Sequence, residues 1–430
     1  MFRIFFKKSP AIEPHPHALD INFGHASIPI AFLQKLIPIG ELPVEKLQTL
    51  KISLRNFKPG DMIFTRGEQA EELTYLRQGE VFLEAGNGAG YTVDSATFKA
   101  CYPLSAGKEH KFSAFAKTFA SIIYLPLCTL LNAPPQLNAP LISPKDEPED
   151  LRKHLFYQGI CAAYRKNELH APSLPDVALR LRMALQKEID IADAVKIVNL
   201  DPIISSKLIQ VVNSPLYRPL TPVVNIYGAI NRLGLQTTQN LATSISLNNL
   251  FVSVDKQLNE KIRSIWRDSI HVASLSYALA SISGRINADE ALLAGLIHNI
   301  GVLPIIAFAE TFNKTAYTSE VLEQTIAAIN GMLGVSILNN WGFPTKLQQI
   351  PLQTANWFYY TSDELQLNDI VLLAIYHHQI GHMHNRKLPP LNTLPAYHKL
   401  GEAELTPDLS LQALHDAKQQ IAEALNFFRA

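Results

Sequence analysis

The spacing of hydrophobic and polar residues divides the chain into four parts. Residues 1–27 open with a very short apolar and basic run and continue rich in Pro and His, which predicts a disordered segment. Apolar residues between Ile28 and Leu50 predict two short helices interrupted by prolines. Short β-rich runs between glycine turns then follow from Ile52 to Val93. This alternation is typical of an antiparallel roll or barrel.

The second half of the chain has helical periodicity. A Pro-rich, finally acidic stretch at residues 130–150 predicts a linker. Residues 147–169 predict one amphipathic helix, whose buried positions we expect to be Leu151, Leu155, Ile160 and Ala163. Further on, Asp201 before Pro202 and the glycine at 234 are start and stop signals for short helices.

The most apolar of these helical stretches, Leu292–Leu303, has the sequence LLAGLIHNIGVL. It predicts a buried helix that carries a polar pair, His298 and Asn299, at one turn. An imidazole beside a carboxylate would bind a divalent cation and place a water on it. A carboxamide oxygen is neutral and a weaker donor, so Asn299 favours a binding function over catalysis.

Composition and charge narrow the choice of function. The 430 residues contain 38 Lys plus Arg and 38 Asp plus Glu, so net charge offers no attraction to nucleic acid. The three cysteines have no metal-binding spacing and indicate a reducing compartment. The apolar run at the start of the sequence is too short to span a membrane. We therefore expect a cytoplasmic protein that binds no nucleic acid and has no membrane span.

Residues 57–86, FKPGDMIFTRGEQAEELTYLRQGEVFLEAG, resemble the β-roll of cyclic-nucleotide-binding domains. The resemblance implies a phosphate-binding cassette in which an Arg precedes a Ser-Ala pair. In this chain Phe112 precedes Ser113 and Ala114, and an aromatic ring supplies no charge-assisted bonds to a phosphate. Lys111 or Lys117 could substitute as point charges, which keeps a cyclic-nucleotide sensor open as an alternative to a docking or dimerising module.

Three strings resemble the HDOD domain, the non-catalytic relative of HD phosphohydrolases found in bacterial signalling proteins: PSLPDVALRLRMAL, VNLDPIISSKLIQVVNSPLY and ALLAGLIHNIGVL. The resemblance extends over about residues 160–425. It implies an all-helical fold with an HD-like core and a regulatory role rather than turnover.

The resemblance also identifies the positions of metal ligands in the catalytic relatives. The first histidine corresponds to Asp268, the His-Asp pair to His298 and Asn299, and a later histidine falls near Asn330. Only His298 keeps the expected residue type in place. Because a catalytic site needs about three protein ligands, we expect no metal and no cofactor.

Two alternative metal sites stay open at this stage. Asp268 and His271 lie one helical turn apart, so they could join His298 in an altered site. His378 and His382 have i, i+4 spacing that can chelate a transition metal, although imidazoles at a helix end also cap carbonyls. Each alternative competes with buried, hydrogen-bonded polar residues that bind nothing.

These interpretations combine into an α+β, multi-domain chain. We expect a cyclic-nucleotide-binding-like β-roll at residues 28–129 and an all-helical HDOD domain at 151–430. The predicted function is regulatory, through unknown protein partners or a ligand and with a possible homo-oligomer. The alternatives are a metal-dependent phosphohydrolase with a rearranged HD site and a cyclic-nucleotide sensor.

Overall fold

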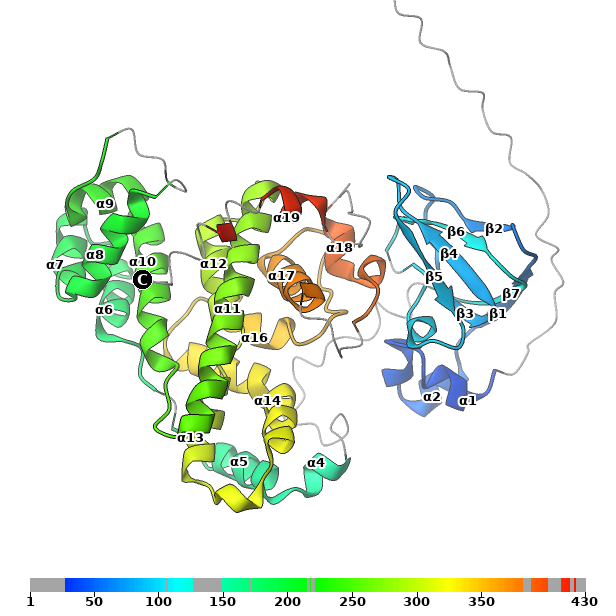
Figure 1. Ribbon diagram of the computed structural model, residues 1–430, viewed down its shortest axis with the longest axis horizontal. Coiled ribbons are helices and arrows are strands. Elements are labelled where there is room, and N and C mark those ends of the chain that lie inside the picture. Colours follow the sequence, from blue (N-terminus) through cyan, green and yellow to red (C-terminus); the bar gives the residue numbers. More distant parts are fainter. Residues whose placement is uncertain are drawn as a thin grey trace, which may run out of the picture. The chain divides into compact units, whose positions relative to one another are not determined.

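The computed structural model divides the chain into two compact units, residues 1–133 and 134–430 (Figure 1). It describes residues 28–105, 107–126, 149–170, 172–214, 217, 221–381, 388–400, 411–417 and 421–422. The predicted disordered segment at 1–27 and most of the predicted linker lie outside these residues. Each unit is considered separately below.

The first unit combines short helices with two small sheets, as the sequence predicts. Its elements are α1 (Ile30–Leu33), η1 (Ile39–Glu41), α2 (Val44–Gln48), β1 (Ser53–Phe57), β2 (Met62–Phe64), β3 (Glu72–Gln78), β4 (Glu80–Glu84), β5 (Gly90–Asp94), η2 (Phe98–Cys101), β6 (Ser113–Ala116) and β7 (Ala120–Pro126), where η marks a 3-10 helix. The strands form sheets in the orders β1-β7-β3 and β2-β6-β4-β5, and all pairings are antiparallel. The predicted antiparallel β-roll is confirmed.

The short N-terminal helices complete the core of this unit. Leu33, Leu36 and Leu47 are buried against Leu73 and Ile123 of the three-stranded sheet. The hydroxyl of Tyr75, a fully buried residue of β3, donates a hydrogen bond to the carbonyl of Ile37 at 3.1 Å. Burial of these apolar side chains fixes helices that are too short to be stable alone.

The second unit is helical throughout its described elements. These are α4 (Glu149–Lys153), α5 (Leu155–Arg165), α6 (Asp176–Leu185), α7 (Ile191–Val198), α8 (Pro202–Val212), α9 (Ile226–Leu233), α10 (Leu235–Leu247), η3 (Asn248–Leu250), α11 (Lys256–Ser283), α12 (Ala288–Ile297), α13 (Val302–Thr311), η4 (Lys314–Ala316), α14 (Ser319–Asn340), α15 (Thr345–Gln348), α16 (Ile350–Gln353), α17 (Leu367–Gly381), η5 (Leu391–Thr393), α18 (Pro395–Lys399) and α19 (Gln412–Asp416). The fold class is therefore confirmed, with the helical description limited to this unit.

The start and stop signals read from the sequence act as expected. The carboxylate of Asp201 accepts hydrogen bonds from the backbone N–H groups of Ile203 and Ile204 and caps α8. Gly234 ends α9 with a φ of 78°, a left-handed conformation that favours glycine.

The prediction of one continuous helix at residues 147–169 is wrong. Within the described part of this range, Glu149–Lys153 and Leu155–Arg165 form two helices, because the chain leaves helical geometry at His154. The His154 ring accepts a hydrogen bond from the N–H of Phe156 at 3.3 Å and so starts α5 anew. This break turns Leu155 outward, where it is 68% exposed, while Leu151 and Ile160 are buried as predicted and Ala163 is half-buried.

The predicted buried helix at 292–303 is also split. Residues 298–301 form a turn between α12 and α13, although both helices are buried as expected. The stretch Ala288–Thr311 has the length and mean hydropathy, 2.0, of a membrane span, but 83% of its apolar window is buried inside the unit. A second such helix, Ser319–Asn340, is 50% buried. Most of the first window and half of the second are therefore buried inside the helical unit.

Candidate functional site

The turn at 298–301 is held between two helices by glycines. A Cβ on Gly295 would lie 2.5 Å from the Cα of Ala273, so α12 packs directly on the backbone of α11. A Cβ on Gly301 would lie 2.0 Å from the carbonyl oxygen of Asn330, so the turn touches α14 equally closely. The polar pair at 298 and 299 is therefore fixed between α11 and α14.

His298 is buried, with 7% of its surface exposed. Its Nδ1 lies 2.6 Å from the carbonyl oxygen of Gly295. Since a carbonyl only accepts, Nδ1 carries the proton and the lone pair is on Nε2. Burial is the main cause that lowers the pKa of His298, to about 4; the hydrogen bond to Gly295 and the charge of Asp268 oppose the shift, and His378 adds to it. The ring is consequently neutral at pH 7.

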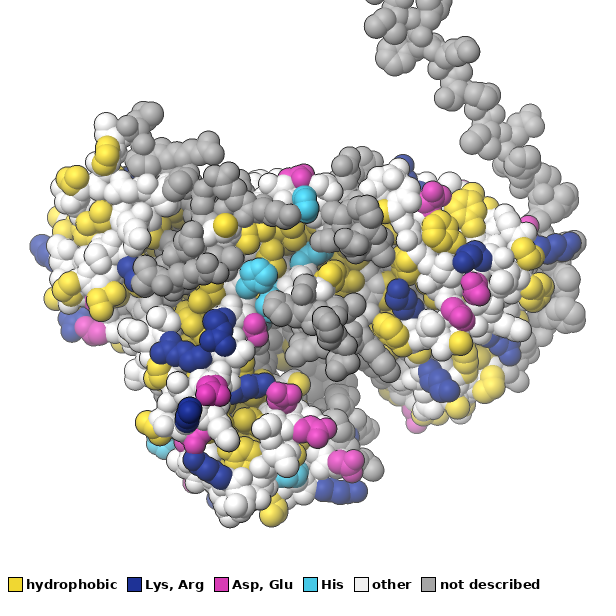
Figure 2. All heavy atoms as spheres, in the orientation of Figure 1, with side chains coloured by type: hydrophobic (Ala, Val, Ile, Leu, Met, Phe, Trp, Pro, Cys, Tyr) yellow, Lys and Arg dark blue, Asp and Glu magenta, His cyan; other side chains and the backbone are white. Residues whose placement is uncertain are grey.

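A second group of polar side chains joins α11 to α17. Nδ1 of His271 lies 2.8 Å from Nδ1 of His378, and the two rings are nearly perpendicular at 77°. Nε2 of His378 lies 3.4 Å from a carboxylate oxygen of Asp268. Figure 2 shows histidine side chains on the surface where α11 and α17 lie side by side.

The structure thus connects residues that the sequence placed in separate candidate sites. Asp268 and His271, left open as partners of His298 in an altered site, both contact His378, and Asp268 and His378 also act on His298 through their charges. The predicted pairing of His378 with His382 cannot be followed, because His382 lies outside the described residues. His378 contacts the neighbouring helix α11 through His271 and Asp268.

Asn299 faces a different neighbour from His298. Its carboxamide oxygen accepts a hydrogen bond from Nδ2 of Asn330 at 3.1 Å. The two positions that correspond to an acid and a later histidine in the catalytic relatives are therefore a pair of neutral amides. Such a pair supplies no negative charge to offset a cation.

The donor set does not fit a metal ion. Among the residues that the structure describes, no group of three or more His, Cys, Asp and Glu side chains is placed to hold one. Two imidazoles and one carboxylate do meet at Asp268, His271 and His378, but they hydrogen-bond or pair with one another. The cluster links α11 to α17 through these polar contacts.

The cassette positions of the β-roll have an apolar environment. Phe112 is 2% exposed and presents an edge to the ring of Tyr91, with the centroids 6.3 Å apart. Ala114 is completely buried on β6, and the hydroxyl of Ser113 accepts a hydrogen bond from the N–H of Arg66 at 3.1 Å.

The two lysines that could have replaced the cassette arginine are paired with acids. Lys111 lies 3.6 Å from Glu109, and Lys117 lies 3.5 Å from Glu80. Each exposed pair contributes little to stability, but it places a carboxylate next to the cation that a phosphate would need.

Sequence reasoning missed two buried features of the helical unit. Asp369 and Lys399 form an ion pair at 2.9 Å, with side chains 1% and 4% exposed. His377 is also buried, which lowers its pKa to about 4. The available signal was a charged or imidazole residue inside an otherwise apolar run, such as Asp369 before IVLLAIY. That signal does not identify the partner.

Comparison with known proteins supports the identity of the helical unit. Residues 171–356 match the model of the HDOD domain, a shorter range than the predicted 151–430 that leaves His378 outside it. A crystal structure from Shewanella amazonensis, provisionally named a metal-dependent phosphohydrolase, is 27% identical with a TM-score of 0.55 and covers 63% of this chain and 97% of that one.

Two further similarities are weaker. An uncharacterized Treponema pallidum protein is 25% identical over 188 residues, and the match covers 40% of this chain and about a third, 35%, of that protein. A structure from Geobacter metallireducens, provisionally named a cyclic nucleotide-binding protein, covers 24% of this chain and 80% of its own, with 19% identity and a TM-score of 0.20. The matched segment shows an HDOD domain at residues 171–356 of this chain.

Proposed function

We propose that this chain is a non-catalytic regulatory protein of bacterial signal transduction, which acts by binding a protein partner or a ligand through its HDOD domain. The observation that carries the proposal is the pairing of Asn299 with Asn330 at 3.1 Å. At the position where an HD enzyme requires a carboxylate, this chain has a neutral side chain already engaged with another neutral side chain.

A catalytic cation beside His298 would have to be held in a buried site. A divalent cation loses its water shell when it enters a protein interior, and anionic ligands compensate for that loss. Beside His298 the nearest acid in the sequence position of a ligand is Asp268, and it lies next to His378. Among the described residues, the amide pair supplies none of the negative charge that would hold a catalytic cation against the buried imidazole, and Asp268 lies beside His378.

The rest of the proposal follows from sequence. We propose a cytoplasmic protein without a cofactor, whose partner is a protein and which could assemble as a homo-oligomer. The β-roll then serves as a docking or dimerising module, since Phe112 stands buried where a phosphate-binding arginine would be needed.

A second candidate, a metal-dependent phosphohydrolase, has specific observations in its favour. His298 is neutral with its lone pair on Nε2, which is the form that binds a metal. The related structure from Shewanella amazonensis carries a provisional name of that class. An altered site of Asp268, His271 and His298 would be its centre.

Metal content and phosphodiester hydrolysis separate the two candidates. Tag-free protein, purified without chelators or nickel resin, is analysed by elemental mass spectrometry and assayed with bis(p-nitrophenyl) phosphate in the presence of Mn²⁺. The variants are His298→Ala, His271→Ala and Asn299→Asp, with His415→Ala as the control because His415 is exposed on α19. We expect less than a tenth of a metal ion per chain and no hydrolysis in the wild type.

Stoichiometric metal together with hydrolysis would overturn the proposal if both are lost in His298→Ala and kept in His415→Ala. Asn299→Asp tests the argument itself, because it restores the carboxylate at the turn. Metal uptake by Asn299→Asp alone would identify the missing charge as the reason why the wild type does not bind.

A further inference from the structure

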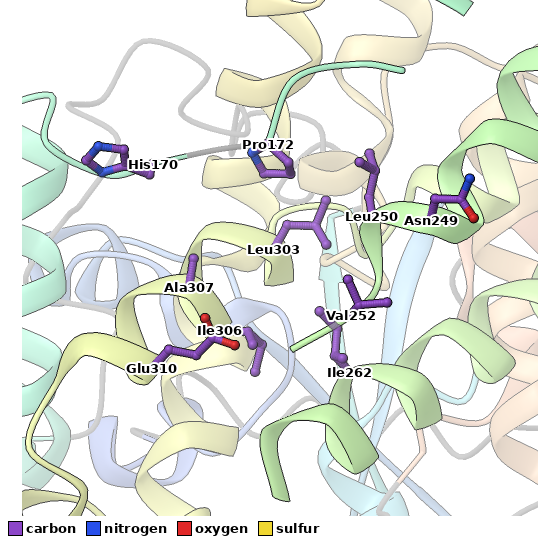
Figure 3. Close-up of a pocket in the computed structure, with 10 residues that line it drawn as sticks. All are labelled: His170, Pro172, Asn249, Leu250, Val252, Ile262, Leu303, Ile306, Ala307 and Glu310. Atoms are coloured by element: carbon purple, nitrogen blue, oxygen red, sulfur yellow. The ribbon is translucent and has the colours of Figure 1, made fainter. Parts of the chain in front are cut away.

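The helical unit contains a cavity of about 370 Å³ that is not lined by His298 or Asn299 (Figure 3). Four stretches that are distant in sequence surround it: the residues before α6, the end of η3 with the loop after it, α11, and α13. This volume lies within the range of roughly 300–1,000 Å³ typical of small-molecule sites.

Most of the cavity wall is apolar. Its apolar side chains include those of Leu250, Val252, Ile262, Leu303, Ile306 and Ala307. Ile262 and Ile306 are buried, whereas Val252 is 51% exposed and stands where the cavity opens to solvent. Apolar walls of this kind do not compensate a ligand's polar groups, so the body of the ligand must be apolar.

One charged side chain, Glu310, lies at the edge of the cavity beside Ile306 (Figure 3). Its Oε1 atom accepts hydrogen bonds from the N–H of Val254 at 3.0 Å and from the hydroxyl of Ser253. These bonds fix the orientation of the carboxylate. Within the described part of the chain no group donates to Oε2.

The neighbouring cation does not neutralise this carboxylate. The ammonium group of Lys314 pairs with Asp255, and Glu310 contributes only the smallest of the interactions that raise the pKa of Lys314. The imidazole of His170, also at the wall, lies with Nδ1 3.0 Å from the carbonyl oxygen of Glu168. The cavity therefore presents one fixed negative charge at the end of an apolar surface.

We propose that this cavity binds a monocationic amine with an apolar body about the size of two fused aromatic rings. The ammonium group would donate to Glu310, and the body would contact Leu303, Ile306 and Ala307. Fatty acids and other anions are disfavoured by the same carboxylate. This inference deepens the proposed ligand-binding role and does not involve His298 or a metal.

Binding at this cavity offers a physical route to regulation. A ligand here contacts the segment that leads into α6, the helix α11 that carries Asp268 and His271, and the helix α13 that follows the turn at 298–301. Any ligand that binds one arrangement of these segments better than another shifts the population toward it.

The test uses two probes with the same rings and opposite charges, 2-(1-naphthyl)ethylamine and 1-naphthaleneacetic acid. Both are titrated into the full chain at pH 7 by isothermal titration calorimetry. We expect one saturable site for the amine and binding of the acid at least about tenfold weaker, since a charge-assisted hydrogen bond is worth about 1.4 kcal/mol or more.

Three substitutions and one control locate the site. Ala307→Phe fills the cavity and should abolish amine binding, and Glu310→Gln should weaken it about tenfold. Val252→Lys, at a half-exposed position that tolerates a polar side chain, should reverse the preference toward the acid. Ile203→Ala, at an exposed residue of α8 outside the cavity, should change nothing.

Three results would each overturn the inference. Folded wild type does not bind the amine, the two probes bind with equal affinity, or binding is unchanged by both Glu310→Gln and Val252→Lys. Thermal melting of each variant confirms that it is folded. If Ala307→Phe does not fold, Val252→Lys still tests the site. The metal and hydrolysis assays are independent readouts, so failure here is distinguishable from failure of the proposed function.

Discussion

The positions that would bind a ligand in related proteins are occupied by different kinds of side chain in the β-roll and in the helical unit. In the β-roll, position 112 holds a buried phenylalanine in contact with Tyr91, so the position is filled by apolar packing. In the helical unit, His298, Asn299 and Asn330 remain polar within the fold and engage a backbone carbonyl or one another. We call the buried side chain of Phe112 the apolar plug of the β-roll. The helical unit has instead a network of hydrogen bonds between neutral groups.

This difference predicts different responses to mutation. An apolar plug is stabilised by burial and tolerates another apolar side chain of similar size, but not a charge. A buried polar network depends on mutual satisfaction, since removing one member leaves its partner without a hydrogen bond. The three tryptophans, Trp266, Trp341 and Trp357, all belong to the helical unit. Their fluorescence therefore reports on that unit, and hydrogen exchange of peptides from β4 and β6 reports on the β-roll.

The largest effect is expected from Phe112→Arg, which restores the residue type of a phosphate-binding cassette. An unpaired charge at this buried position should destabilise the β-roll by about 4 kcal/mol. Hydrogen exchange should accelerate in β4 and β6, while tryptophan fluorescence should report unchanged unfolding of the helical unit. Phe112→Leu, as the matched control, should cost only about 1 kcal/mol. A stable Phe112→Arg variant that binds a cyclic nucleotide would contradict the interpretation of Phe112 as an apolar plug.

Acidification should destabilise the helical unit by an amount that is smaller for each buried histidine. The folded-state pKa values of His298 and His377 are about 4, whereas an unfolded histidine titrates near 6.5. The unfolded chain therefore binds more protons between these values. The stability that depends on the two neutral rings is fully present above about pH 6.5. It is lost as the pH falls toward 4, by up to about 3 kcal/mol for each ring.

Urea unfolding followed by tryptophan fluorescence at pH 7.5, 6 and 5 measures this dependence. His298→Gln should reduce the slope of unfolding free energy against pH by about one proton, and the exposed control His415→Gln should leave it unchanged. A slope that is equal in wild type and His298→Gln would mean that His298 is not buried as a neutral ring.

The amide pair is expected to contribute less again. Asn299→Ala or Asn330→Ala alone should destabilise the helical unit by about 1–2 kcal/mol, because each leaves one amide group without its partner. The double variant should cost scarcely more than either single one, with a coupling of about 1 kcal/mol. Additive losses in urea unfolding at pH 7.5 would show that the two amides do not act together.

Much of the fold was predictable because its signals are local. Asp201 before Pro202 and the glycine at 234 specify helix ends through short-range hydrogen bonds and backbone freedom, and both predictions are confirmed. The break at His154 was not predictable in the same way. A histidine in an amphipathic pattern does not disclose that its ring will accept a bond from the N–H of Phe156.

The arrangement of the candidate site was less predictable, because its contacts join distant parts of the chain. His298 and Asn299 were identified from their sequence context, but the contact of His271 with His378 spans 107 positions. Helical periodicity determines which face a residue occupies, not which helix lies opposite. The pairing of Asp369 with Lys399 escaped sequence analysis for the same reason.

The smallest predicted effect concerns the ring contact in the β-roll. Tyr91→Leu keeps an apolar side chain beside Phe112 and removes the edge-on ring interaction, so its coupling with Phe112→Leu in a double-mutant cycle should be about 0.5 kcal/mol. Hydrogen exchange of β4 and β6 measures each variant. A coupling above about 2 kcal/mol would exceed what a ring pair provides. The plug would then depend on a specific contact, as the amide pair does, and the contrast between the two regions would disappear.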